Sequence, residues 1–282
     1  MAREDNIRVF EDTQALCRMN KKIAESLKAS LAAQELILEK DVLPEPDRNR
    51  YEKKTHVTVS KKRTLEAARG YADQKVAVHN FASATNPGGG VTTGSGAQEE
   101  CLCRCSDLYF CLKTPDMQER FYNAHRRVQD PLHNDDIIYT PNVLVFKTDT
   151  AMPRRMEEND WYPVDVITCA APNLRAKPSN RYNSGDGNRA VSIKNKELLA
   201  IHEKRLRRML DVALLKGVQT VILGAFGCGA FENNPEVVAL AAKNVLVDYL
   251  YAFQNIEFAV YCTPRDEGNY RVFERVLRAY CR

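Results

Sequence analysis

Two adjacent glutamates, Glu99 and Glu100, are the residues of this sequence whose type and placement best suit acid–base chemistry, because they follow directly on a glycine-rich loop. The glycines of that loop are Gly88, Gly89, Gly90, Gly94 and Gly96. Glycine lets backbone N–H groups approach a ligand closely, which suits a loop wrapped on phosphate or ribose. Ser95 and Gln98 have the spacing of a capping box, which predicts a helix beginning near Gly96. Both carboxyl groups are then expected beside the loop, at the start of that helix.

A second loop of similar design holds Gly224, Gly227 and Gly229 between an apolar strand and a helix that Asn234 and Pro235 are expected to begin. Both loops should emerge at the carboxyl ends of strands, where open α/β sheets usually bind ligands. Two such loops, if they converge, could hold a diphosphate between them.

The common phosphate-binding motifs do not fit either loop. No lysine follows the glycines as a P-loop requires, and Glu99 and Glu232 stand where a dinucleotide fingerprint needs its third glycine. Cys228, inside the second loop, has two interpretations: a nucleophile beside a helix N-terminus, or, as we expect, a small residue tolerated in a tight turn.

The elements that must position these loops follow an alternating pattern. Apolar stretches predict a short strand over HVTVS and longer ones at 76–83, 143–148, 164–171, 218–226 and 256–262. Helices are expected over 98–112, 195–216, 235–250 and 267–280. Residues 11–40 lack Gly and Pro, which favours helix there too. The prediction is a mixed-sheet α/β fold, with a helical N-terminal extension over 1–45 and one catalytic domain over 46–282.

Composition narrows the class of protein. The 282 residues are 44% hydrophobic and 28% charged, and the net charge of +4 is too small to argue for a nucleic-acid binder. The first residues, MAREDNIRVFED, lack the apolar segment of a secretory signal, so a cytoplasmic protein without membrane contact is expected. The nine cysteines include a cluster at Cys101, Cys103, Cys105 and Cys111, whose spacing suits neither a disulfide framework nor a structural zinc site. They are expected to be reduced thiols that fill core space, with a metal or redox role as the alternative.

Three further segments have less direct interpretations. His79 lies in a predicted strand and is expected to be a hydrogen-bonded interior histidine rather than a base. Residues 203–209 are expected to be a solvated helix face, with contact to an acidic polymer as the alternative. The polar stretch 174–194 predicts a long loop that covers a site.

The spacing of the first loop resembles a known family. Gly88–Gly90, seven residues, and Gln98–Glu99–Glu100 are similar to the GGG-x6–8-QEE signature of poly(ADP-ribose) glycohydrolases. The stretches NFASATNPGGGV and GAFGCGAFENNP resemble the bacterial branch of that family, which is built on a macrodomain. The resemblance covers roughly residues 55–282 and implies a three-layer α/β/α sandwich.

The resemblance also implies roles for individual residues. Glu100 would be the catalytic acid that protonates the leaving ribose oxygen and then activates water, and Glu99 would hold ribose hydroxyls. The other residues that it marks as substrate-binding are Asn86, Gly88, Gly89, Gly90, Val91, Gln98, Gly227, Cys228, Gly229, Ala230 and Phe231. Either Phe226 or Phe231 could pack against a sugar or the adenine.

The chemistry agrees with that assignment. Adjacent helical residues diverge by about 100°, so both carboxyl groups cannot address one atom, and one acid serving both steps fits better. The prediction is hydrolysis of ribose–ribose bonds in poly(ADP-ribose), with ADP-ribose as the product and no cofactor, metal or obligate protein partner. The alternatives are removal of a single ADP-ribose from protein or nucleic acid, a module that binds ADP-ribose without turnover, and an unrelated nucleotide-binding protein.

Overall fold

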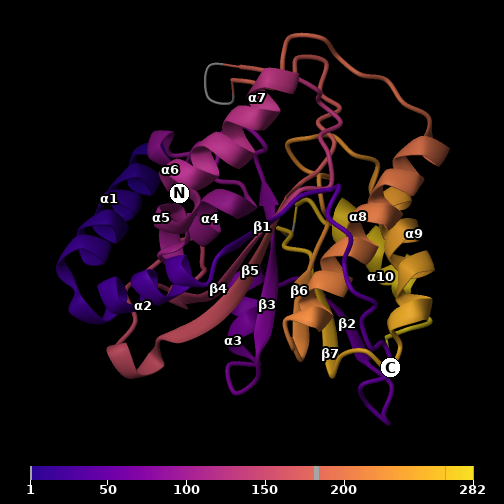
Figure 1. The fold of residues 1–282 in the computed structure, drawn as a ribbon, viewed down its shortest axis with the longest axis horizontal. Helices are drawn as coiled ribbons and strands as arrows, with labels where there is room; N and C mark the ends of the chain where they lie inside the picture. Colours follow the sequence, from indigo (N-terminus) through magenta and orange to yellow (C-terminus); the bar gives the residue numbers. More distant parts are fainter. Residues whose placement is uncertain (1, 181–183, 264, 282) are drawn as a thin grey trace.

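The computed structural model describes residues 2–180, 184–263 and 265–281. At its centre lies a mixed sheet in the order β1-β4-β5-β3-β6-β7-β2 (Figure 1). Its strands are β1 Glu35–Ile37, β2 His56–Ser60, β3 Val76–Ala82, β4 Ile137–Val145, β5 Tyr162–Ala170, β6 Thr220–Leu223 and β7 Asn255–Ala259. The five strands from β5 to β2 in this order pair in parallel, whereas β4 is antiparallel to both of its neighbours. The five parallel strands therefore bring their carboxyl ends to one edge of the sheet.

Helices cover both faces of this sheet (Figure 1). One face carries α8 Asn195–Leu215, α9 Pro235–Leu246 and α10 Gly268–Leu277, and one large cluster of buried side chains lies beneath them. The helices before β4 are α1 Arg3–Met19, α2 Lys21–Ala32, α3 Thr64–Arg69, the 3-10 turn Val91–Thr93, α4 Gln98–Cys105, α5 Leu108–Leu112, α6 Pro115–Met117, the π-helical turn Gln118–Asn123 and α7 Ala124–Val128. Side chains of α1, α3, α4 and α5 bury a second cluster against the other face. The predicted three-layer sandwich with a mixed sheet is confirmed.

The predicted strands all exist, but several predicted strands and helices were wrong in extent. The strand expected over 143–148 is β4, which begins six residues earlier and ends at Val145, and the strand expected over 218–226 is limited to Thr220–Leu223. The helix expected over 98–112 is divided into α4 and α5, because the chain is extended at Ser106. In place of one helix over 11–40, the chain forms α1 from Arg3 and a second helix, α2, after a break at Asn20. Strand β1 then begins at Glu35. Pairing of β1 with β4 overrides the local helix preference there. Part of the predicted N-terminal extension thus lies in the central sheet, while the division into domains stays a prediction.

Other predictions concern side-chain environments. All nine cysteines are free, and Cys103, Cys105 and Cys111 are fully buried, which confirms the core-filling interpretation for these three.

Among the described residues no group of His, Cys, Asp or Glu could hold a metal ion, and no helix is both long and apolar enough to cross a bilayer. The solvated face expected at 203–209 was wrong for Arg205, which is buried and bonded to Asp135.

Candidate active site

A pocket of about 840 Å³ opens at the carboxyl ends of the parallel strands. The first loop contributes Gly89, Gly90, Gln98, Glu99 and Glu100 to its lining, and the second contributes Gly227, Gly229, Ala230 and Phe231. The fold therefore brings together the two glycine loops that the sequence marks. Asn86, Gly88, Val91 and Cys228 lie outside the described lining, and their predicted binding roles stay predictions.

Glu99 is turned inward, with only 3% of its surface exposed. Its Oε2 accepts a hydrogen bond from the backbone N–H of Ser83 at 2.8 Å, and Asn80 Nδ2 donates to its Oε1 at 3.4 Å. Burial, reinforced by the neighbouring charge of Glu100, raises the pKa of Glu99 well above its usual range. Glu99 is thus anchored to the end of β3, and its site favours the protonated form.

Glu100 is anchored differently. Its Oε1 accepts a hydrogen bond from the Gly90 N–H at 2.9 Å, whereas Oε2 is buried without a hydrogen-bond partner among the described residues. A buried polar atom normally has a partner, and Glu100 lines the pocket, so this oxygen has unused hydrogen-bonding capacity at a site where a ligand could bind. The two carboxyl groups therefore point to different partners, as their spacing on a helix predicts.

Gly89 allows this close approach. Its φ is +57°, and a Cβ at this position would lie 2.6 Å from Glu100 Oε1 and 3.1 Å from Glu99 Oε2. A side chain here would be strained in its backbone and would push the carboxyl groups away. Glycine is therefore required at position 89 both by the left-handed backbone conformation and by the short distance to the two carboxyl groups.

Gln98 does not act as a capping residue. Helix α4 begins at Gln98 with Ala97 as its N-cap, and no side-chain hydrogen bond caps it, so the predicted capping box with Ser95 is wrong. Instead the Gln98 amide accepts from the Phe81 N–H at 2.9 Å and donates to the His79 carbonyl at 2.7 Å. It ties the start of α4 to β3, which fixes the two glutamates relative to the sheet.

The predicted residues outside the pocket lining have visible structural roles. The Asn86 amide oxygen accepts a hydrogen bond from Arg126 Nη2 at 2.8 Å, and Asn86 Nδ2 donates to the Ser184 carbonyl. Val91 is fully buried in the core. Burial raises the pKa of Cys228 to about 12, so its thiol is protonated at neutral pH. A protonated thiol is a poor nucleophile, which favours the tight-turn interpretation of Cys228.

The second loop separates its two phenylalanines. Phe226 is buried in the core, with its ring 4.3 Å from that of His79, whereas Phe231 lines the pocket. The Arg175 guanidinium lies 5.6 Å from the centre of the Phe231 ring. Burial also lowers the pKa of His79 to about 3, which confirms an interior histidine that is neutral at pH 7. Of these two phenylalanines, Phe231 is therefore the one available to a ligand.

Several lining residues were not found by sequence reasoning. They come from segments without a motif and are Arg3, Asn6, Arg63, Thr64, Asp149, Tyr261 and Asn269. The position of Arg63 just after β2, and of Tyr261 just after β7, is the signal that could have pointed to them, because both follow parallel strands.

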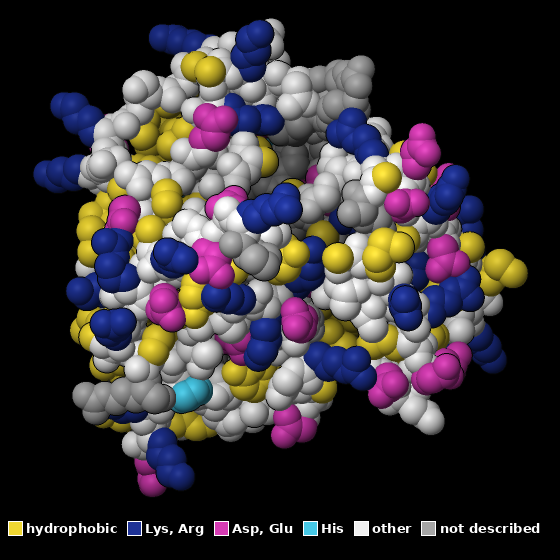
Figure 2. All heavy atoms as spheres, turned by 180° about the vertical axis from the view of Figure 1, so that it is seen from behind, with side chains coloured by type: hydrophobic (Ala, Val, Ile, Leu, Met, Phe, Trp, Pro, Cys, Tyr) yellow, Lys and Arg dark blue, Asp and Glu magenta, His cyan; other side chains and the backbone are white. Residues whose placement is uncertain are grey.

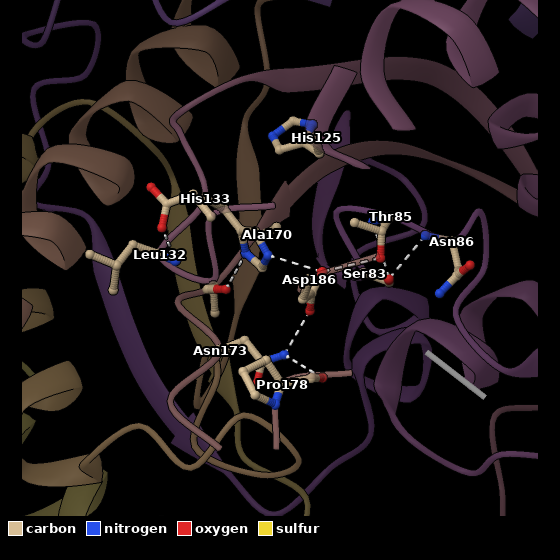
Figure 3. A network of polar contacts seen from close by, with 12 residues as sticks. Ser83, Thr85, Asn86, His125, Leu132, His133, Ala170, Asn173, Pro178 and Asp186 are labelled. Carbon is tan, nitrogen blue, oxygen red and sulfur yellow. Dashed lines mark hydrogen bonds and ion pairs between the residues drawn. The ribbon is translucent and has the colours of Figure 1, made fainter. Parts of the chain in front are cut away.

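The polar segment 174–194 reaches the pocket, as predicted, through Arg175 and Asn180, although residues 181–183 lie outside the described part. Asp186 anchors this segment and lies between Thr85 and Asn173 (Figure 3). Its carboxylate accepts hydrogen bonds from Asn173 Nδ2 at 2.6 Å and Thr85 Oγ1 at 3.1 Å, and His133 Nε2 lies 3.4 Å away. This buried carboxylate joins the loop after β3 to the segment after β5.

Surface charge adds no large single-sign field on the face seen in Figure 2, where Lys and Arg side chains are interspersed with Asp and Glu. On this face, therefore, there is no single-sign patch that would attract an anionic ligand.

The raised pKa of Glu99 has a consequence for stability. A carboxyl group whose folded pKa exceeds its unfolded value of 4.5 stabilises the fold below that pH, and this contribution is lost as the pH rises through the folded pKa. Glutamine does not titrate, so we expect this pH-dependent loss of stability to be absent in Glu99→Gln. The unfolding temperature of the variant relative to wild type should therefore increase from pH 4.5 to pH 8. Thermal unfolding monitored by circular dichroism measures this, and the exposed Glu11→Gln should show no such trend.

Comparisons with known proteins agree with this geometry. Residues 4–148, slightly more than half of the chain, match a family model described as "Microbial-type PARG, catalytic domain". A structure of poly(ADP-ribose) glycohydrolase from Thermomonospora curvata is 30% identical with a TM-score of 0.82, and the alignment covers 97% of this chain and 99% of that one. A second structure from that organism, bound to the inhibitor ADP-HPD, has 30% identity, a TM-score of 0.79 and coverage of 96% and 99%.

The enzyme from Deinococcus radiodurans, solved in complex with ADP-ribose, is 31% identical with a TM-score of 0.73 and coverage of 91% and 98%. A search of curated proteins gave no match. The matched segment contains the glycine loop and both glutamates, and the structural likeness extends over nearly the whole chain. The chain therefore belongs to the microbial-type poly(ADP-ribose) glycohydrolases.

Proposed function

We propose that this protein hydrolyses the ribose–ribose O-glycosidic bonds of poly(ADP-ribose) and releases ADP-ribose. The observation that carries the proposal is the Glu100 carboxyl group, held by the Gly90 N–H through one oxygen and leaving the other without a described partner in the pocket. The similar enzymes solved with ADP-ribose and with ADP-HPD support this ligand class. A module that only binds ADP-ribose would need the loops but would have no use for this acid.

The reaction needs one acid in two roles. Protonated Glu100 gives its proton to the glycosidic oxygen of the leaving ribose as the bond between that oxygen and the anomeric carbon breaks. The resulting carboxylate then takes a proton from water, whose oxygen bonds to the oxocarbenium-like carbon. The proton returns to Glu100, so one water molecule is consumed and no cofactor is required.

Glu99 and the two loops position the substrate in this account. Glu99, fixed to Ser83, binds ribose hydroxyls, while Gly227, Gly229 and Ala230 offer backbone groups to the diphosphate. Phe231 packs against a sugar or the adenine. We retain Asn86, Gly88, Val91 and Cys228 as proposed parts of the same binding region, acting through the loops that carry them.

The site of action that we propose is the cytoplasm. Nine free cysteines support it, because thiols stay reduced in that compartment. The proposed partners are poly(ADP-ribose) or an ADP-ribosylated macromolecule as substrate and ADP-ribose as product, with no membrane and no obligate protein partner.

A substrate comparison tests the proposal. The wild-type protein is incubated with purified poly(ADP-ribose) and, in parallel, with a mono-ADP-ribosylated protein and a mono-ADP-ribosylated oligonucleotide, and free ADP-ribose is measured by chromatography. We expect release from the polymer at a rate far above that from either mono-modified substrate. Release only from a mono-modified substrate would favour the single-unit eraser, and ADP-ribose binding without any release would favour the binding module.

A further inference from the structure

The N-terminal helix α1 is in direct contact with the glycine loop that holds Glu100. Asn6, which is buried, donates a hydrogen bond from its Nδ2 to the Gly94 carbonyl at 2.9 Å. Gly94 has a φ of +77°, and a Cβ there would collide with the carbonyl oxygen of Arg3. Arg3 and Asn6 also line the pocket, although they stand 91 and 88 residues before Gly94 in the chain.

Packing fixes the register of α1 against α4 and α5. The Phe10 ring meets the Tyr109 ring edge-on at 4.9 Å, and Tyr109 in turn fills the space beside Gly88. One turn further, Thr13 Oγ1 donates to the Arg104 carbonyl at 2.5 Å. These contacts hold α1 against α4 and α5 at more than one point.

A buried lysine secures the same helix to the end of β4. The Lys147 ammonium, with its side chain only 2% exposed, donates to the Val9 carbonyl and to Thr13 Oγ1, each at 2.7 Å. It also forms an ion pair with Asp12 at 2.8 Å. A buried charge with several partners restricts the position of the helix, because any shift leaves it unsatisfied.

A short series of hydrogen bonds leads from Asn6 to the acid. Asn6 holds the Gly94 carbonyl, the next residue Ser95 donates its N–H to the Gly90 carbonyl at 3.0 Å, and the Gly90 N–H donates to Glu100 Oε1. Arg104, on α4, donates to the Ser95 carbonyl at 2.6 Å and so closes the loop against its own helix. The position of the Gly90 N–H therefore depends on where α1 holds Gly94.

We propose that Asn6 is a positioning residue for the reaction, and that α1 through it sets the place of the Gly90 N–H and hence of the Glu100 carboxyl group. This inference rests on the proposed function. It predicts a specific kinetic pattern: loss of the Asn6 hydrogen bond lowers kcat, because the acid is misplaced, and leaves ADP-ribose affinity nearly unchanged, because the second loop still binds the diphosphate.

The test compares Asn6→Ala with wild type and with Glu11→Ala, which changes an exposed residue of the same helix. We expect kcat on poly(ADP-ribose) to fall about tenfold in Asn6→Ala, with KM and the Kd of ADP-ribose changed by less than about twofold. Glu11→Ala should match wild type in all three. An unchanged kcat, or a large increase in KM and Kd that shows direct contact with substrate, would overturn the inference.

Gly94→Ala provides a second variant on the loop side of the same contact. It should show the same fall in kcat. Gly217→Ala, at a φ of +73°, reproduces the backbone strain without a collision with any described residue, and kcat should not fall there.

Hydrogen–deuterium exchange separates this inference from the proposed function, because it needs no turnover. In Asn6→Ala the amides of residues 89–96 should exchange faster than in wild type, while those of residues 225–231 stay the same. Unchanged exchange in the first segment would overturn the inference even if the wild type hydrolyses the polymer. A wild type that releases no ADP-ribose would overturn the proposed function itself, and the inference with it.

Discussion

Glu100→Gln is expected to lower kcat on poly(ADP-ribose) on the order of a thousandfold or more, because one side chain serves as both acid and base. Glutamine keeps the shape of the residue and can still accept the Gly90 N–H bond, but it carries no proton to donate. Because the geometry is conserved, the Kd of ADP-ribose, measured by calorimetry, should stay within about threefold of wild type.

The control for this prediction is Glu232→Gln, which changes an exposed glutamate next to the pocket-lining Phe231. It should retain the kcat of wild type. If Glu100→Gln turned over at a rate similar to this control, Glu100 would not be the acid. If ADP-ribose binding were lost together with turnover, the residue would be acting on substrate affinity and not on the chemical step.

Gly89→Ala should have the second-largest effect, a fall in kcat of about a hundredfold. The new Cβ would stand 2.6 Å from Glu100 Oε1, so either the carboxyl group or the loop must move. The left-handed φ of +57° adds strain of about 1–2 kcal/mol, which should also lower the unfolding temperature by several degrees.

The two effects can be separated by Gly217→Ala. Gly217 has a φ of +73°, and no described residue other than its chain neighbours lies within 4 Å of the added Cβ, so this variant should lose similar stability and keep full turnover. Steady-state kinetics and thermal unfolding on both variants measure the difference. Turnover by Gly89→Ala at the level of Gly217→Ala would mean that the close approach of this glycine to the two carboxyl groups does not matter.

The parts of the fold that depend on regular patterns could be predicted from the sequence. Apolar runs located the parallel strands of the mixed sheet. Loops that follow such strands share one edge, so the convergence of the two glycine loops could be predicted. Asn234 caps α9 as its type and the following proline predict. These features are local or follow from general rules of sheet topology.

The features that could not be predicted depend on long-range partners. Ser95 and Gln98 have the spacing of a capping box, yet Gln98 bonds to backbone groups of β3 that compete for its amide. Residues 35–37 have helical neighbours in sequence but pair with β4, about a hundred residues later. The contact of α1 with the glycine loop could not be predicted either, because no residue near Asn6 in the sequence indicates Gly94 as its partner.

The most direct test of the account is the identity of the product that the wild-type protein releases from purified poly(ADP-ribose), determined by mass spectrometry. Cleavage of the ribose–ribose bond by Glu100 and water predicts intact ADP-ribose, formed by the wild type and not by Glu100→Gln. Products that retain a phosphoribosyl group on AMP would show that the diphosphate is cleaved instead. Such products, or no product at all under conditions where ADP-ribose binds, would contradict the account.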